Sequence, residues 1–468
     1  MEAPAASPGA RRLLGRAVEV RPAEKRAVRL GFVYFFALLA AYYLLRPVRD
    51  EMGVRGVRAL QWDFSATFAA LSLAVPAYSA LFARLPRARA VPLVYRFFLV
   101  NLVLFWAAFR LELWPVVVGR TFFVWLSVFN LLVVSVFWSF MADLFTAEQG
   151  RRLFGFVAAG GSLGAIVGSA TAGLLVGAIG IPGLLAISAV LLEVAARCAA
   201  GIAEHPPAQG RAQGQPDEAA PERAGGAGGA GGREGAARVA PRSDGGREGI
   251  ARVAPRSDGA PVGGTALSGV AAVARSPFLR ALAAQMILFT FASTFLYFQG
   301  VRIVAAAVPD PARRTAFFAA VDLGVNVAAF AAQSLATGRL AVAFGLGPAL
   351  AAVPVVTVAG FAALAAAPTL LVLGGVQSLR RVGHYALEKP ARDVLYTVVP
   401  REEKYKSKGF IETVVYRGGD FLAGWAYTGL AALGVAASPL AIAALPLGLA
   451  SLAIAVWLAR RERSLERP

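Results

Sequence analysis

A run of charged residues lies between two long apolar segments, from His384 to Asp420. Placing a charged side chain in hydrocarbon costs about 2.5–3.5 kcal/mol, so within a membrane such residues face a cavity or a charged partner. The part from Pro400 to Lys408 is typical of a solvated loop, but charged residues also lie beyond both of its ends. Two interpretations stay open for those residues: side chains that line an anion pathway, or frayed helix ends beside a solvated loop.

A second charged segment, LLRPVRDEMGV, contains Arg46, Arg49 and Asp50 directly after an apolar run. Arg49–Asp50 and Arg392–Asp393 are adjacent pairs of opposite charge, one in each half of the chain. The planar arginine fork can donate two hydrogen bonds to a phosphate, and a neighbouring acid can hold the arginine while the site is empty. The pairs indicate either an anion-binding site or a gate of ion pairs that never contacts a substrate.

The sequence therefore predicts two sets of site residues. The candidates for substrate binding are Arg46, Arg49, Arg392, Lys408 and Arg417. The candidates for charge pairing or gating are Asp50, Asp143, Arg151, Arg152, Glu388, Asp393, Glu412 and Asp420. We expect no enzyme, because the sequence shows no catalytic triad, no nucleophile elbow and no G-x-x-x-x-G-K-[ST] phosphate loop. With two histidines and one cysteine, it predicts no metal site and no cofactor either.

Membrane helices are the elements expected to position these residues. Of 468 residues, 57% are hydrophobic and only 16% are charged, whereas soluble domains carry about a quarter charged residues. At about 20 residues per span, the chain has room for twelve spans and for no large soluble domain. The net charge of +19 indicates basic loops and contact with anionic lipid, and it does not require a nucleic-acid partner.

The apolar runs form two sets of six, on either side of a segment rich in Gly, Ala, Pro and Arg. We expect an all-α membrane protein of 12 transmembrane helices in two six-helix pseudo-repeats. A disordered linker joins them and contains a near-perfect tandem repeat, GREGAARVAPRSDG followed by GREGIARVAPRSDG. The motif EQGRRLFGF before the fifth run is similar to EEKYKSKGF before the eleventh. Parallel six-helix repeats resemble the plan of the major facilitator superfamily, whose substrate site lies between the halves. The predicted parts are a tail (1–30), the first bundle (31–200), the linker (201–277), the second bundle (278–459) and a second tail (460–468).

Lys and Arg gather in both tails and in the connections between runs two and three, four and five, and ten and eleven. The positive-inside rule predicts that these segments and both termini are cytoplasmic. Met1 to Arg29 lacks the apolar core and the cleavage site of a signal peptide, so we predict a tail there. We expect a monomer in a bacterial cytoplasmic membrane, in contact with lipid.

Three stretches carry a resemblance to a known family. HYALEKPARDVLYTVVPREEKYKSKGFIE resembles a signature of the ATP:ADP antiporters, the nucleotide transporters of plastids and intracellular bacteria. LLRPVRDEMGV resembles their first-span motif, and FWSFMADLFTAEQGRRLFG resembles their connection between the fourth and fifth spans. The chain departs from the family pattern at five positions. Arg49, His384, Arg392 and Asp420 stand where the family has lysine, and Asp143 stands where it has an amide. The resemblance implies strict exchange of ATP and ADP by alternating access, with Arg46, Arg49 and Arg392 holding the phosphates.

Three functions stay open on the sequence. The first is the nucleotide exchange that the resemblance implies. The second, which the altered cations favour, is a proton-coupled carrier of another phosphorylated or organic anion, with Asp50, Asp143, Glu388 or Glu412 titrating. The third is a membrane scaffold or sensor that transports nothing and whose linker recruits a partner.

Overall fold

The structure is a computed structural model that describes residues 20–84, 87–204, 266–335 and 345–466. These residues belong to one compact unit, Met1–Gln209 together with Gly264–Pro468. Within the described ranges the chain is helical almost throughout and contains no β-strand. The tandem repeat and most of the predicted linker and first tail lie outside the described residues.

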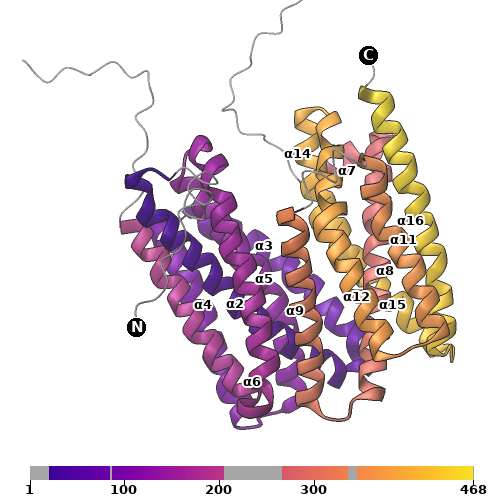
Figure 1. The fold of residues 1–468 in the computed structure, drawn as a ribbon, viewed down its shortest axis with the longest axis horizontal. Coiled ribbons are helices and arrows are strands. Elements are labelled where there is room, and N and C mark those ends of the chain that lie inside the picture. The colour runs from indigo at the N-terminus through magenta and orange to yellow at the C-terminus, as the bar shows by residue number, and fades with distance from the viewer. Residues whose placement is uncertain (1–19, 85–86, 205–265, 336–344, 467–468) are drawn as a thin grey trace, which may run out of the picture. The chain divides into compact units, whose positions relative to one another are not determined.

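The first half of the chain forms one group of helices, drawn from indigo to magenta in Figure 1. Its helices are α2 (Lys25–Arg55), α3 (Leu60–Arg84), α4 (Arg87–Arg110), α5 (Pro115–Leu144) and α6 (Ala147–Glu204), with short 3₁₀ turns at Pro22–Glu24 and Val57–Ala59. The helix α6 is two spans in succession, because Gly180 has φ 63° and ψ −175° and breaks the helical backbone. Only glycine adopts this conformation readily, and Pro182 follows at the start of the second span.

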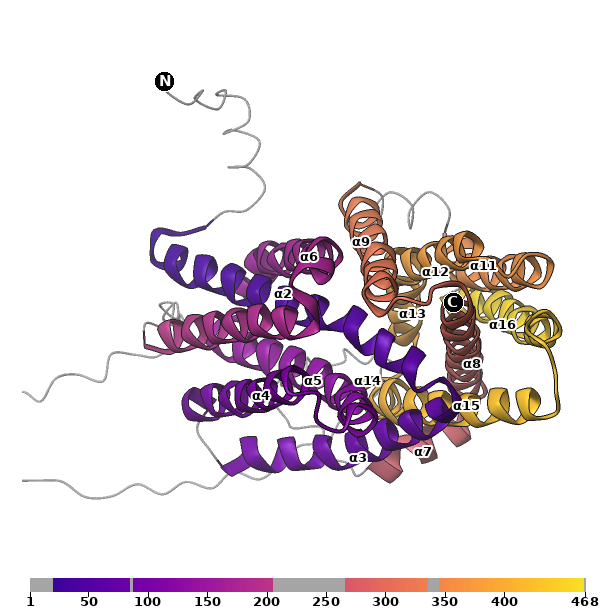
Figure 2. The same cartoon turned by 90° about the horizontal axis from the view of Figure 1, so that it is seen from below.

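The second half forms another group, drawn in pink, orange and yellow in Figures 1 and 2. Its helices are α7 (Ala266–Arg275), α8 (Pro277–Ala307), α9 (Pro311–Leu335), α11 (Leu346–Ala366), α12 (Leu370–Gly383), α13 (Lys389–Leu395), α14 (Arg401–Phe410), α15 (Tyr416–Ala432) and α16 (Ala437–Glu466). Two π-helical turns, His384–Glu388 and Ile411–Val415, join α12 to α13 and α14 to α15. Such i→i+5 turns often mark functional sites in helices.

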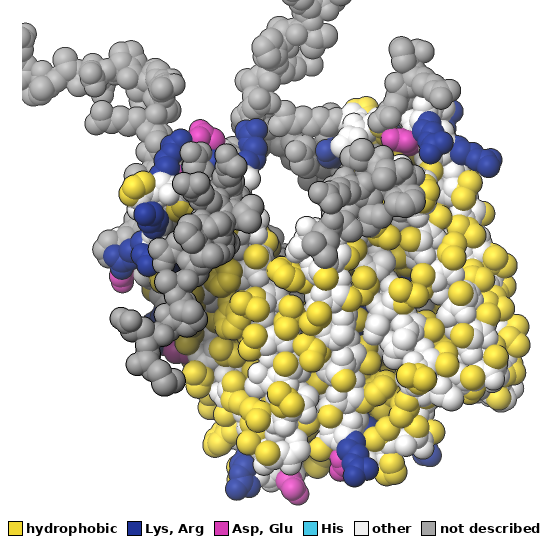
Figure 3. Space-filling view, viewed as in Figure 1, with side chains coloured by type: hydrophobic (Ala, Val, Ile, Leu, Met, Phe, Trp, Pro, Cys, Tyr) yellow, Lys and Arg dark blue, Asp and Glu magenta, His cyan; other side chains and the backbone are white. Residues whose placement is uncertain are grey.

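The predicted fold class is confirmed. Among the described residues, nine helices are long and apolar enough to cross a membrane, and α6 counts as one of them although it contains two spans. The spans built from α12–α13 and from α14–α15 are charged and interrupted by the π turns, which explains why hydropathy alone misses them. On the face drawn in Figure 3, hydrophobic side chains cover the middle of the protein and charged side chains gather toward the two ends. This is an integral membrane protein.

Close packing of α6 against α2 holds the first bundle together. A Cβ atom on Gly164 would lie 2.2 Å from the carbonyl oxygen of Phe36, and one on Gly168 would lie 2.5 Å from that of Ala40. Without a hydrophobic drive between helices in lipid, such close backbone approach supplies the van der Waals contact that associates them. The Gly-rich stretch Gly160–Gly173 is therefore a packing face of α6.

The prediction of disorder over 201–277 is wrong at both ends. Residues 201–204 complete α6, and Ala266–Arg275 form α7, which is amphipathic and packs against α14. A Cβ atom on Gly269 would lie 2.7 Å from the carbonyl oxygen of Lys406, so the two backbones are in direct contact there. The apolar face of α7 packs against α14. The Gly- and Arg-rich composition of the whole segment 201–277 does not predict this short helix.

Each bundle has two ends, which we call the Glu24 end and the Glu51 end after the buried glutamates at the two ends of α2. The Glu24 end is where α2 begins and where α3 and α5 end. The Glu51 end is where α2 ends and where Val308 begins the connection from α8 to α9. Both Glu24 and Glu51 are buried, at 2% and 0% exposure.

A charged cavity between the bundles

A cavity of about 280 Å³, called the central cavity below, lies between the two bundles and is lined by both. The first bundle contributes residues of α2 and α3, and the second contributes residues of α8, α9, α12 and α15. Its charged lining residues are Arg46, Arg49, Asp50, Asp322, Arg380, Arg381, Arg417 and Asp420. Aromatic rings from both bundles complete the wall, among them Phe64, Phe68, Phe289, Tyr297, Tyr385 and Tyr416.

Helical spacing explains why these side chains share the central cavity. Arg46 and Asp50 are four residues apart on α2, so they lie on one face of that helix. On α12, Gln377, Arg380, Arg381 and the following His384 repeat at intervals of three and four residues and also line the cavity. Each helix thus turns one polar stripe inward and leaves its apolar sides to lipid and to packing.

Asp322 on α9 forms the shortest ion pairs of the central cavity. Its Oδ1 atom lies 3.1 Å from Nη1 of Arg46 on α2 and 2.6 Å from Nη1 of Arg381 on α12. The side chain of Asp322 is almost completely buried, at 3% exposure, while each arginine side chain remains about one-fifth exposed. One carboxylate oxygen therefore joins an arginine of the first bundle to an arginine of the second.

A second contact between the bundles involves the adjacent residues Arg49 and Asp50. Tyr297 on α8 donates its hydroxyl hydrogen to Oδ1 of Asp50 at 3.0 Å, and Nη1 of Arg49 lies 3.5 Å from the same oxygen. The guanidinium of Arg49 also lies 4.0 Å from the centroid of the Phe123 ring, a cation–π contact. The Arg49–Asp50 pair that the sequence predicts is present and faces the cavity.

The second bundle supplies two further cationic groups. Arg417 pairs with Asp420 at 3.5 Å, and Asp420 also accepts a hydrogen bond from Thr294 at 3.0 Å. Arg380 donates to Oγ1 of Thr357 and to the carbonyl oxygen of Phe289, both at 3.0 Å. These bonds satisfy and orient the guanidinium of Arg380 without neutralising its charge.

The central cavity is positively charged. Its lining holds five arginines against three carboxylates, an excess of two positive charges before His384 is considered. Unpaired charges at low dielectric are costly, so this excess favours a bound anion. Arginine is suited to phosphate and carboxylate groups because its planar fork donates paired hydrogen bonds.

Several predicted site residues lie outside the lining of the central cavity. Arg392 is buried behind it, 3.8 Å from Glu388, and within the described ranges its Nε and Nη1 atoms have no hydrogen-bond partner. Glu388 in turn lies 2.9 Å from Nδ1 of the lining residue His384. Lys408 pairs with Asp393 at 2.8 Å, where both side chains are more than a third exposed. Neither Arg392 nor Lys408, both predicted to bind the substrate, lines the central cavity in this structure.

Glu412, another predicted gating residue, lies in the second π turn and is half-buried. Its Oε1 atom is buried and finds no hydrogen-bond partner among the residues that the structure describes. It does not line the central cavity.

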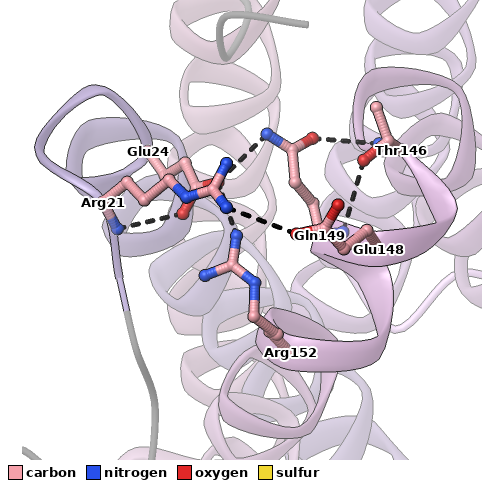
Figure 4. Close-up of polar contacts among 6 residues, drawn as sticks. All are labelled: Arg21, Glu24, Thr146, Glu148, Gln149 and Arg152. Atoms are coloured by element: carbon pink, nitrogen blue, oxygen red, sulfur yellow. Dashed lines mark hydrogen bonds and ion pairs between the residues drawn. The ribbon is translucent and has the colours of Figure 1, made fainter. Parts of the chain in front are cut away.

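Asp143, Arg151 and Arg152 lie near the end of α5 and the start of α6, at the Glu24 end. Figure 4 shows Arg152 pointing toward Glu24, with an ion pair of 2.9 Å between them. Gln149 donates to the same carboxylate at 3.1 Å, so the cluster fastens the start of α2 to the start of α6. Asp143 and Arg151 are exposed. This cluster lies within the first bundle and does not line the central cavity.

Three charged residues of the lining, Asp322, Arg380 and Arg381, are not among the site residues that the sequence predicts. A signal for Asp322 was present, because it is the single acid of α9 and an acid within an apolar span is a candidate functional residue. The adjacent arginines Arg380 and Arg381 also lie within an apolar run. The prediction concentrated on residues 384–420 because charged residues are more frequent there.

The two bundles also meet at the Glu51 end. Oε1 of Glu51 accepts a hydrogen bond from Arg55 at 2.9 Å and lies 3.5 Å from Nη1 of Arg314 on α9. Trp425 on α15 donates its indole hydrogen to Oγ of Ser65 on α3 at 3.0 Å. These contacts form two seams between the bundles at the Glu51 end, α2 with α9 and α3 with α15.

No family model and no curated protein matches this sequence. Solved structures do match. A mutant of the nucleoside transporter NupG has a TM-score of 0.59 at 11% identity, over 94% of this chain and 100% of its own. The chain has the major facilitator fold. A bacterial homologue of the human lysosomal transporter Spinster, inward-facing and unoccupied, has a TM-score of 0.53 at 13% identity, over 95% of this chain and 96% of its own. The POT family transporter PepTSo has a TM-score of 0.56 at 12% identity, over 94% of this chain and 98% of its own.

Proposed function

We propose that this protein is a transporter that exchanges anionic nucleotides of the ATP and ADP type across the membrane by alternating access. The observation that carries the proposal is the excess of two positive charges in a cavity that both bundles line. The solved structures that share the fold include a nucleoside transporter and POT family transporters, which supports a small-molecule substrate. The resemblance of the charged stretches to the ATP:ADP antiporters favours nucleotides among the anions.

In this proposal, the phosphates contact the arginines that line the central cavity. Arg46, Arg49 and Arg417 keep the role that the sequence predicts for them, and Arg380 and Arg381 take the place of Arg392 and Lys408. Arg392 instead holds Glu388 behind the cavity wall. The rings of Phe64, Phe289 and Tyr385 offer flat apolar surface to a base or another uncharged part of the substrate.

Exchange follows from the contacts between the bundles. In the empty protein, Arg46–Asp322 and Tyr297–Asp50 join the two bundles across the cavity. Breaking these contacts without a replacement leaves buried charged groups unpaired, which is expensive. An anion that takes over the arginines removes this cost, so the loaded protein changes conformation faster than the empty one. Transport in one direction then requires a substrate for the return.

The direction of opening follows from the seams at the Glu51 end. We propose that the structure represents the inward-facing state, with the Glu24 end cytoplasmic as the basic loops predict. In the opposite state, the seams α2 with α9 and α3 with α15 would have to separate.

Uptake of labelled ATP into proteoliposomes, preloaded with ADP or left empty, tests the proposal. Uptake that requires internal ADP is the expected result. Arg46→Gln should lose most of this uptake, and Arg197→Gln should not, because Arg197 lies outside the cavity and pairs with Glu193 at an exposed site. Correctly folded protein that takes up no ATP under either condition would refute nucleotide exchange.

One observation favours a second candidate, a proton-coupled carrier of another anion. His384 lines the cavity and its Nδ1 lies 2.9 Å from the buried carboxylate of Glu388, a pair able to hold a proton at the cavity wall. Such a carrier would accumulate its anion in response to a pH gradient without any internal substrate. The same vesicles, with a pH gradient imposed, distinguish the two functions.

A further inference from the structure

Asp322 has unused hydrogen-bonding capacity in the central cavity. Oδ1 is shared between Arg46 and Arg381, while Oδ2 is buried and has no hydrogen-bond partner among the described residues. Nη2 of Arg381 is likewise buried without a hydrogen-bond partner in the part of the chain that the structure describes. A carboxylate can accept on both oxygens and a guanidinium donates from three nitrogens, so this group is only partly satisfied as it stands.

The other two lining acids have a different arrangement. Asp420 pairs with Arg417 on its own helix and with Thr294, both in the second bundle. Asp50 pairs with its neighbour Arg49 and reaches the other bundle only through the hydroxyl of Tyr297. Among the described lining acids, Asp322 is the one whose ion pairs join arginines of both bundles.

We propose that Asp322 is an internal competitor for the substrate anion. It occupies the guanidinium groups of Arg46 and Arg381 while the cavity is empty, and an anion must displace it to bind both. The inference concerns how the proposed site works, and it rests on the proposed function only in requiring that the central cavity bind an anion. Asp322 thus positions the arginines and sets the affinity, without needing to contact the substrate.

Weakened binding has a use in a transporter. Two arginines that donate charge-assisted bonds to one anion would bind it tightly, and tight binding slows release. A carboxylate that re-forms its ion pairs when the anion leaves lowers the cost of that release. Because Arg46 and Arg381 belong to different bundles, the exchange of partners also links occupancy of the site to the contact between the bundles.

The test is the Asp322→Asn variant of the full-length protein, purified in detergent. Asparagine has nearly the same shape but carries no negative charge, so both arginines become available to the anion. With ADP and inorganic pyrophosphate as probes, we expect the variant to bind about tenfold more tightly than the wild type, which corresponds to about 1.4 kcal/mol. In exchange assays, the half-saturating concentration should fall together with the maximal rate. Asp322→Glu retains the charge and should bind with nearly wild-type affinity.

The outcomes separate this inference from the nucleotide proposal. Pyrophosphate that binds more tightly to the variant, with no ADP binding to either protein, supports the competitor and refutes nucleotide exchange. A probe that binds the wild type and binds Asp322→Asn no more tightly overturns the competitor and leaves the proposed function standing. Absence of binding of both probes to both proteins overturns both. A merely structural role for Asp322 predicts weaker binding in the variant, the opposite of the expected result.

Asp322→Asn leaves two arginines without their carboxylate partner and could fail to fold for that reason. In that case a second pair of variants tests the same inference. Arg381→Gln and the double variant Arg381→Gln/Asp322→Asn differ only in the acid, and the double variant has the same net charge as the wild type. If Asp322 competes for Arg46, pyrophosphate should bind the double variant several-fold more tightly than it binds Arg381→Gln. Equal or weaker binding would overturn the inference.

Discussion

Glu51 provides a direct test of the seam between α2 and α9, through the variant Glu51→Gln. Its side chain is fully buried, and Oε1 accepts a bond from Arg55 on the same helix and lies 3.5 Å from Nη1 of Arg314 on the other bundle. Hydrogen bonds to charged groups contribute about 1.5–3 kcal/mol. Only the contact with Arg314 joins the bundles, and it is long, so we take the lower value. A loss of about 1.5 kcal/mol shifts the equilibrium between the closed and open seam about tenfold.

The assay measures access to the cavity from the Glu51 end. The single Cys198 is replaced by alanine and Thr67, which lines the cavity, by cysteine. With the Glu51 end outside, as proposed above, a thiol reagent that does not cross the membrane should label Thr67→Cys in intact cells about tenfold faster in the Glu51→Gln background. Arg314→Gln should act in the same direction.

Arg313→Gln is the matched control, because Arg313 is the exposed neighbour of Arg314 on the same helix. It should leave the labelling rate unchanged. A cysteine at the exposed Val116 should react at one rate in all backgrounds, which verifies access of the reagent. Unchanged labelling of Thr67→Cys in both Glu51→Gln and Arg314→Gln would refute the assignment of this seam as a gate.

Three further predictions follow from single contacts. Arg46→Gln removes a charge-assisted bond of about 1.5–3 kcal/mol and should raise the half-saturating substrate concentration about tenfold or more in vesicle uptake, whereas Arg197→Gln should not. Gly164→Ala places a Cβ atom against a backbone carbonyl of α2 and should destabilise the protein by about 1–3 kcal/mol, measured as a lower unfolding temperature in detergent. Gly155→Ala is the control: no described atom lies within 4 Å of the added Cβ, so this variant should unfold at the wild-type temperature. Glu24→Gln removes the carboxylate that Gln149 and Arg152 share, and should lower the unfolding free energy by about 1–3 kcal/mol; an unchanged melting temperature would contradict the role of that cluster.

The amino-acid sequence by itself determined the class of this protein. Apolar runs of span length, a low charged fraction and a change of composition between two sets of runs predict a twelve-helix membrane protein in two bundles. The prediction of membrane spans succeeds because every polar group in hydrocarbon costs free energy. A span is therefore recognisable from the hydropathy of its own residues, without knowledge of the rest of the fold. The same cost explains why Arg46, Arg49, Asp50, Arg417 and Asp420, charged residues within or beside spans, were candidates for a cavity and are found lining one.

Only the tertiary structure decided which charges meet. Arg46 and Asp322 are far apart in sequence and form an ion pair because α2 and α9 pack together across the two bundles. Arg392 carries the same charge as Arg381, yet it lies behind the cavity wall. The wider turn of the π-helix at His384–Glu388 shifts the helical phase between these two arginines, so the spacing of residues does not predict which one faces the cavity. Helix packing and helical phase are properties of the folded chain, and for that reason the composition of the site required the structure.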